Sequence, residues 1–82
     1  MDMITIYSAT WCPPCHTLKA YLDKLGIKYE VKDVDHDKGA IEESMAKSNQ
    51  IGIPVTDIDG IIIVGFNKPM IDQALRERKL IK

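Results

Sequence analysis

The sequence has few cysteines, no marked excess of charge of either sign and no long apolar run. Its 82 residues carry 11 Lys and Arg against 12 Asp and Glu, a formal net charge of −1. Such a balance gives no reason to expect nucleic acid or an anionic membrane as a partner. No apolar run approaches the ~20 residues of a membrane helix, and the first residues lack the basic and apolar regions of a secretory signal. We therefore expect a cytoplasmic protein without membrane contact.

The chain contains only two cysteines, Cys12 and Cys15. Small secreted domains stabilised by disulfides carry several cysteines spread along the chain, so a disulfide scaffold is excluded. Two thiols spaced C-x-x-C in a cytosolic chain indicate redox chemistry instead. A chain of this length has room for one modest core, and we expect residues 1–82 to form a single, monomeric domain.

Apolar spacing and turn residues predict alternating strands and helices along the whole chain. Apolar residues between positions 18 and 25 recur at i, i+3, i+4 and i+7, and Gly26 follows where an amphipathic helix would end. Asp59-Gly60 separates two short apolar runs, which is the standard signal of a β-hairpin. Strands are expected over 3–8, 28–34, 55–58 and 61–64, and helices over 13–25, over 39–48 and from Asn67 and Pro69 onward.

The predicted order of elements, β-α-β-α-β-β-α, defines an α/β fold class. A parallel βαβ unit followed by an antiparallel hairpin predicts a four-stranded mixed sheet with helices on both faces. The helix over 39–48 is the weakest of the three and carries Ile41 and Met45. We expect Met3, Met45 and Met70 to be packing residues.

The motif Cys12-Pro13-Pro14-Cys15 lies where the first strand gives way to the first helix, an edge of the sheet where sites form. A cysteine that caps a helix has its reactive thiolate favoured by the macrodipole and the free amides. The second cysteine lies one turn further, close enough to close a disulfide. We interpret Cys12 as the nucleophile and Cys15 as the resolving thiol. No proton acceptor for Cys15 is evident, since Ile6 beneath the site is apolar.

Two further features adjoin this motif. Ile53-Pro54 follows Gly52 and directly precedes a predicted strand. A cis bond there would turn the Ile53 backbone toward the cysteines to pair with an extended substrate, whereas a trans proline would simply begin an edge strand. Beside the C-x-x-C motif the cis form is favoured. Trp11, next to a solvent-facing cysteine, is interpreted as a platform for substrate rather than a packing residue.

Other classes of site fit parts of the sequence. Cys12-x-x-Cys15-His16 matches the attachment string of c-type haem, but haem attachment normally follows export, for which no signal is present. Two cysteines are too few for a four-cysteine zinc or iron–sulfur site in one chain, although a dimer could share a cluster. We predict no metal ligand and no cofactor, and a metal- or cluster-binding module is the alternative from another class.

The order of elements and the motifs resemble the thioredoxin superfamily over nearly the whole chain. The passage from Tyr7 to Cys12 is similar to glutaredoxins, Trp11 and Gly52-Ile53-Pro54 look more like thioredoxin, and Trp-Cys-Pro-Pro-Cys is similar to tryparedoxins. The length is closest to glutaredoxins and NrdH-type redoxins. The resemblance implies a thioredoxin fold and a dithiol–disulfide oxidoreductase that uses the first cysteine as nucleophile and the cis-proline loop for substrate docking.

The glutathione contacts typical of glutaredoxins are largely missing. Ala9 stands where they usually carry a lysine, Gly65-Phe66 replaces a Gly-Gly pair, and Asn67-Lys68 replaces acidic residues. NrdH-type redoxins share this loss and take electrons from thioredoxin reductase. The resemblance therefore implies protein disulfides as substrates and a reductase-type donor, with a glutathione-dependent glutaredoxin as the alternative. The implied substrate-binding residues are Trp11, Pro13, Ile53, Pro54, Gly65 and Phe66.

Overall fold

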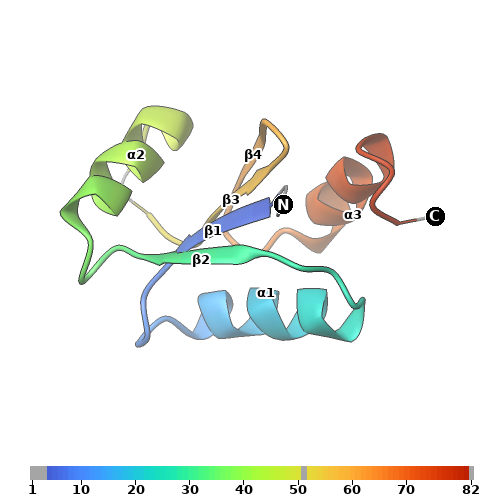
Figure 1. The fold of residues 1–82 in the computed structure, drawn as a ribbon, viewed down its shortest axis with the longest axis horizontal. Coiled ribbons are helices and arrows are strands. Elements are labelled where there is room, and N and C mark those ends of the chain that lie inside the picture. Colours follow the sequence, from blue (N-terminus) through green and yellow to red (C-terminus); the bar gives the residue numbers. More distant parts are fainter. Residues whose placement is uncertain (1–3, 51, 82) are drawn as a thin grey trace.

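The computed structural model describes residues 4–50 and 52–81. It contains one four-stranded sheet with helices on both faces. Figure 1 shows α2 on one face and α1 on the other. None of the helices in the described residues is long and apolar enough to cross a membrane. In chain order the elements are β1 (Ile4–Ser8), α1 (Pro13–Lys24), β2 (Glu30–Asp33), α2 (Lys38–Ser48), β3 (Val55–Ile58), β4 (Ile61–Val64) and α3 (Lys68–Glu77).

The strand order is β2-β1-β3-β4, so the strand that leads to the cysteines lies inside the sheet. β1 pairs with β2 in parallel, whereas β3 is antiparallel to both β1 and β4. This confirms the predicted mixed sheet and the order of its elements. The hairpin turn is also confirmed, because Asp59 and Gly60 have φ of 48° and 96°, the positive values that a type I′ turn requires.

Helix α1 ends as the sequence predicts. Gly26 has φ of +72°, a left-handed conformation that glycine adopts without a steric penalty. The Ile27 N–H then donates to the Leu22 carbonyl at 3.0 Å, which satisfies one of the carbonyls left free at the helix end. Because the chain turns back sharply here, β2 returns parallel to β1.

Strand β2 is shorter than expected, covering Glu30–Asp33 rather than 28–34. It is an edge strand, and Val31 is 41% exposed. An edge strand pairs on one side only and is less completely covered, so its ends and outward side chains remain accessible to water.

Helix α2 presents a different face to the sheet than its apolar residues predict. Ala40 and Ser44 are buried, whereas Ile41 and Met45 are each 41% exposed. The large Tyr7 side chain on β1 is fully buried and is tied to this helix through its hydroxyl. Only small side chains fit between that ring and the helix, so the expectation that Met45 packs in the core is wrong. Met70 on α3 is likewise 47% exposed, against the same expectation, and Met3 lies outside the described residues.

The core is divided between the two faces of the sheet. The larger cluster joins residues of the strands to α1 and α3, and the smaller cluster contains Tyr7, Val55, Ala40 and both cysteines. The larger cluster consists of Ile4, Ile6, Leu18, Leu22, Ile58, Ile63, Ile71, Ala74 and Leu75.

Thr56 on β3 is fully buried, and its Oγ1 has no hydrogen-bond partner among the described residues. A buried hydroxyl without a partner costs about 1–3 kcal/mol of desolvation. We expect Thr56→Val, which keeps the shape, to raise the free energy of unfolding by about 1 kcal/mol and the Tm by roughly 4–8 °C. Thr56→Ser keeps the hydroxyl, loses a methyl group and should lower stability. A valine variant less stable than the parent in thermal unfolding would contradict this account.

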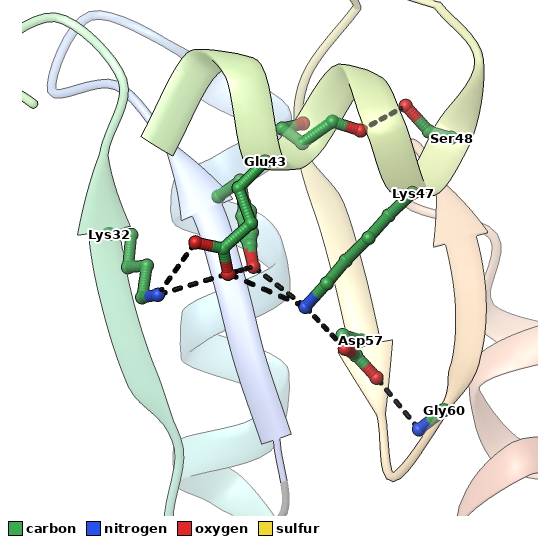
Figure 2. Close-up of polar contacts among 8 residues, drawn as sticks. Lys32, Glu43, Lys47, Ser48, Asp57 and Gly60 are labelled. Atoms are coloured by element: carbon green, nitrogen blue, oxygen red, sulfur yellow. Dashed lines mark hydrogen bonds and ion pairs between the residues drawn. The ribbon is translucent and has the colours of Figure 1, made fainter. Parts of the chain in front are cut away.

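A network of charged side chains joins α2 to the strands beneath it (Figure 2). The Tyr7 hydroxyl donates to Glu43 and accepts from Lys47 Nζ at 2.8 Å. Lys47 Nζ also bonds Asp57 Oδ2 at 2.6 Å, and Lys32 Nζ bonds Glu43 Oε1 at 3.0 Å. Side chains from β1, β2 and β3 therefore all converge on the inner face of one helix.

Candidate active site

Cys12 and Cys15 lie at the start of α1, at the end of the loop that follows β1. Cys12 is the N-cap residue, and its Sγ accepts the Cys15 N–H at 3.4 Å. Pro13 and Pro14 occupy the first helical positions and have no N–H to offer the sulfur. Cys12 is only 3% exposed, so the expectation of a solvent-facing cysteine is wrong, and Cys15 is fully buried; both are free thiols. Cys12 is the outer of the two sulfurs and caps the helix, as the sequence predicts.

The pKa of the Cys15 thiol is raised to about 11, mainly by burial and secondly by the hydrogen bond with Cys12. A backbone hydrogen bond from Ala9 and the positive charge of Lys19 act in the opposite direction. Since only the thiolate attacks a disulfide, Cys15 is inactive at neutral pH while Cys12 is reduced. A mixed disulfide at Cys12 removes the charge and hydrogen bond of its sulfur, which lowers the pKa of Cys15 when Cys15 must react.

This coupling predicts a pH dependence that ultraviolet absorbance of the thiolate can follow. In the reduced protein the last thiol should ionise near pH 11, because burial and Cys12 both raise the pKa of Cys15. In Cys12→Ala we expect Cys15 to ionise at lower pH, since the hydrogen bond and charge of Cys12 are gone. In Lys19→Gln it should ionise at higher pH. Equal titration midpoints in the parent and Cys12→Ala would show that burial alone sets this pKa.

Trp11 projects into solvent with 67% of its surface exposed. Its indole Nε1 donates to Asp35 Oδ2 at 2.6 Å, which holds the ring against the connection between β2 and α2. The ring is therefore fixed at its far edge rather than buried, consistent with its interpretation as a platform. Sequence reasoning missed Asp35, since only the parallel pairing of β1 with β2 brings it to the site.

The bond between Ile53 and Pro54 is cis, as favoured from the sequence. Pro54 is buried, Ile53 is half-buried, and Ile53 packs against the cluster that contains both cysteines. The Gly65 N–H donates to the Pro54 carbonyl at 2.8 Å, which places Gly65 next to this loop. Three of the predicted substrate-binding residues thus form one continuous piece of structure.

Phe66 is half-buried, and its ring meets Tyr21 edge-to-face with centroids 5.9 Å apart. The next residues are engaged within α3, since Asn67 Oδ1 accepts the Met70 N–H at 3.3 Å and Lys68 pairs with Asp72 at 3.3 Å. The positions that differ from the glutathione-binding pattern therefore stabilise the start of this helix and its contact with α1.

His16 is exposed, and its Nε2 lies 2.6 Å from the Thr10 carbonyl oxygen. The ring is thus directed back to the loop before Cys12. Over residues 4–50 and 52–81, no three side chains of His, Cys, Asp or Glu come together in a way that could hold a metal ion.

An apolar groove of about 320 Å³ opens beside the cysteines. Trp11 and Ile53 form the end nearest Cys12, and exposed side chains of α2 form the opposite wall. Sequence reasoning assigned Ile41 and Met45 to the helix but not to a site. Their distance from Cys12 along the chain gives no local signal of this role. The lining residues are Trp11, Val34, Ile41, Ser44, Met45 and Ile53.

A dithiol at the N-terminus of a helix, beside a cis-proline loop, suits thiol–disulfide exchange. The fold is shared with a glutaredoxin from Archaeoglobus fulgidus, which superimposes with a TM-score of 0.85 over 93% of this chain and 88% of that one at 23% identity. This similarity shows that the chain has a thioredoxin-like fold.

The sequence model of the Glutaredoxin family matches residues 4–63. A glutaredoxin-like 8.6 kDa protein of the rubredoxin operon of Clostridium pasteurianum is 44% identical over 92% of this chain and 100% of its own length. The glutaredoxin-like NrdH-redoxin of Escherichia coli is 30% identical, with a TM-score of 0.77 over 85% of this chain and 91% of that chain. The chain belongs to the glutaredoxin family and is therefore a thiol–disulfide oxidoreductase.

Proposed function

We propose that the protein reduces disulfides of other proteins through Cys12 and Cys15 and is itself reduced by a thioredoxin-reductase-type enzyme. The Cys12 thiolate attacks one sulfur of the substrate disulfide, forms a mixed disulfide and releases the other sulfur as a thiol. Cys15 then attacks Cys12 Sγ, which releases the second substrate thiol and forms the Cys12–Cys15 disulfide. The substrate gains two electrons and two protons, and the reductase returns two electrons to the protein.

The order of attack is supported by the environments of the two sulfurs. Cys12 accepts a backbone N–H at the helix start, whereas burial raises the pKa of Cys15 to about 11. The first thiol is therefore the better nucleophile at neutral pH, and the second becomes reactive after the first has been consumed. Lys19, whose charge lowers the pKa of Cys15, favours this second step.

The choice of electron donor depends on one observation, the distribution of charge around the cysteines. Glutathione carries two carboxylates, which a binding site must neutralise or hydrogen-bond. Ala9 is buried and uncharged, Lys68 already pairs with Asp72, and the carboxylate of Asp35 lies beside Trp11. These features disfavour a small thiol with two carboxylates and a net negative charge, and they are compatible with a protein donor. The Escherichia coli NrdH-redoxin, described as having a thioredoxin-like activity profile, belongs to the same structural group.

Oxidation of NADPH during insulin reduction tests this proposal when the electron supply is exchanged. One reaction contains thioredoxin reductase, and the other contains glutathione with glutathione reductase. Turnover only with thioredoxin reductase supports the proposal, and turnover only with glutathione contradicts the argument from charge. If both reactions are inactive and Cys12→Ser behaves like the parent, the chain is instead a binding module, which metal analysis of the purified protein would examine.

A further inference from the structure

The groove beside the cysteines is lined by several exposed apolar side chains. Trp11 is 67% exposed, and Ile41 and Met45 are each 41% exposed. All three line the same hollow. Exposed apolar residues that gather in one place mark a binding surface, whereas scattered ones carry no such meaning.

The lining of the groove includes the residue that directly precedes the reacting cysteine. Trp11 directly precedes Cys12, and Ile53 packs against the buried cluster that contains both cysteines. From there the groove runs to Ile41 and Met45 on α2. A chain whose cysteine is attacked by Cys12 must therefore pass this hollow within a few residues of its own disulfide.

The charge at the mouth of the groove is negative. Val34 lines the hollow and is flanked by Asp33 and Asp35. Asp33 pairs with His36, whereas Asp35 accepts the indole N–H of Trp11 and forms no ion pair among the residues that the structure describes. The charge of Asp35 also acts on His36, whose pKa it helps to raise. A carboxylate thus lies next to the exposed aromatic ring.

We propose that the groove binds an apolar side chain of the substrate protein, next to a lysine or arginine that pairs with Asp35. This assignment rests on the proposed function, whose substrate class it makes more specific. A volume of about 320 Å³ is at the small end of binding pockets and accommodates one aliphatic or aromatic side chain. A cation there also meets the exposed face of Trp11, which attracts positive charge. The preferred disulfide therefore lies in a segment that is both apolar and basic.

Synthetic peptides test this specificity without any electron donor. Each peptide carries one cysteine linked to thionitrobenzoate, with Leu or Ser and Arg or Glu at the neighbouring positions. Protein reduced with dithiothreitol and desalted is mixed with each peptide, and release of the coloured thiol gives the rate. We expect Leu to react about tenfold faster than Ser and Arg about two- to fivefold faster than Glu. The preference for Arg should decline with added salt.

Matched variants assign these preferences to the groove. Met45→Ser should lose most of the preference for Leu, whereas Met70→Ser, at a similarly exposed methionine on α3 outside the groove, should keep it. Asp35→Asn should abolish the preference for Arg while its amide oxygen still accepts the Trp11 indole N–H. Glu77→Gln removes one negative charge at the end of α3 and should keep that preference.

The possible outcomes distinguish failure of this inference from failure of the proposed function. Equal rates for all peptides, or preferences that survive Met45→Ser and Asp35→Asn, overturn the inference. Failure to reduce any peptide and also dithiobis-nitrobenzoate overturns the proposed function instead. A dimer in sedimentation that Met45→Ser dissociates would show that a second copy covers the groove, which also overturns the inference.

Discussion

Cys12→Ser is expected to abolish reduction of insulin, leaving only the uncatalysed rate. A serine hydroxyl remains protonated at neutral pH and cannot replace a thiolate as the attacking group. The substitution leaves the cap in place, because a serine oxygen also accepts the N–H at the third helical position. Far-ultraviolet circular dichroism and thermal unfolding should therefore match the parent. Residual turnover above background in this variant would show that Cys15 can initiate the reaction.

Cys15→Ser should show a different defect. Cys12 is still able to form a mixed disulfide, so the first substrate thiol is released in a single burst. Release of the second thiol then requires a thiol from solution. An intramolecular thiol has an effective concentration of roughly 10⁵–10⁸ M in well-oriented cases, so we expect the second step to slow by at least about a thousandfold.

Mass spectrometry of quenched Cys15→Ser reactions should detect the covalent complex with substrate. Cys12→Ser treated in the same way is the matched control and should form none. If Cys15→Ser turns over at the parental rate, resolution proceeds without Cys15, as in a monothiol mechanism. That result would contradict the assigned role of the second cysteine while leaving Cys12 as the nucleophile.

Local signals in the sequence account for most of the fold. Gly26 and Asp59-Gly60 sit where the backbone needs positive φ, and each residue type predicts the turn that the structure contains. The position of the two cysteines at the start of a helix could also be predicted, because it depends only on residues adjacent in the chain. The cis bond at Ile53-Pro54 was also predicted from local sequence, since a peptide bond before proline adopts the cis form at low cost.

The groove could not be predicted, because its walls come from separate elements. Ile41 and Met45 have the apolar character of core residues, and only the burial of Tyr7 beneath α2 forces them outward. Asp35 lies next to Trp11 because β1 and β2, which precede these two residues, pair in parallel. Periodicity reports which residues share a helix face but not which face the sheet covers. Contacts between distant segments therefore decided the part of the site that surrounds the cysteines.

The position of α2 depends on the polar network that Figure 2 shows. Lys47 is central to it, because its ammonium group contacts both the Tyr7 hydroxyl and Asp57. The pKa of Lys47 is raised, because the hydrogen bonds and charges of Asp57 and Tyr7 outweigh the opposing effect of its burial. It therefore remains charged throughout the pH range in which the protein is folded. Removing it leaves a carboxylate and a phenol under the helix without their shared partner.

Lys47→Met is accordingly expected to lower the free energy of unfolding by about 1–3 kcal/mol, the cost of leaving the partly buried Asp57 carboxylate without its cationic partner. In a domain of this size that corresponds to a Tm lower by roughly 4–8 °C for each kcal/mol. Chemical and thermal unfolding measure both quantities. Lys32→Met is the matched control, since Glu43 keeps its bond to Tyr7 when Lys32 is lost. We expect a much smaller effect there.

The network also contributes an acid-sensitive part of the stability. Hydrogen bonds from Tyr7 and Lys32 hold the pKa of Glu43 below its ordinary value. A carboxyl group whose pKa is lower in the folded than in the unfolded state stabilises the fold above the unfolded value and loses this contribution as the pH falls through the folded one. The difference in stability between the parent and Glu43→Gln should therefore be largest near neutral pH and shrink below about pH 4.5, the ordinary pKa of a glutamate. A difference that is constant from pH 7 to pH 3 would show that Glu43 acts through packing rather than charge.

Because α2 carries Ile41 and Met45, loosening this helix should also weaken the peptide preferences of the groove before the protein unfolds.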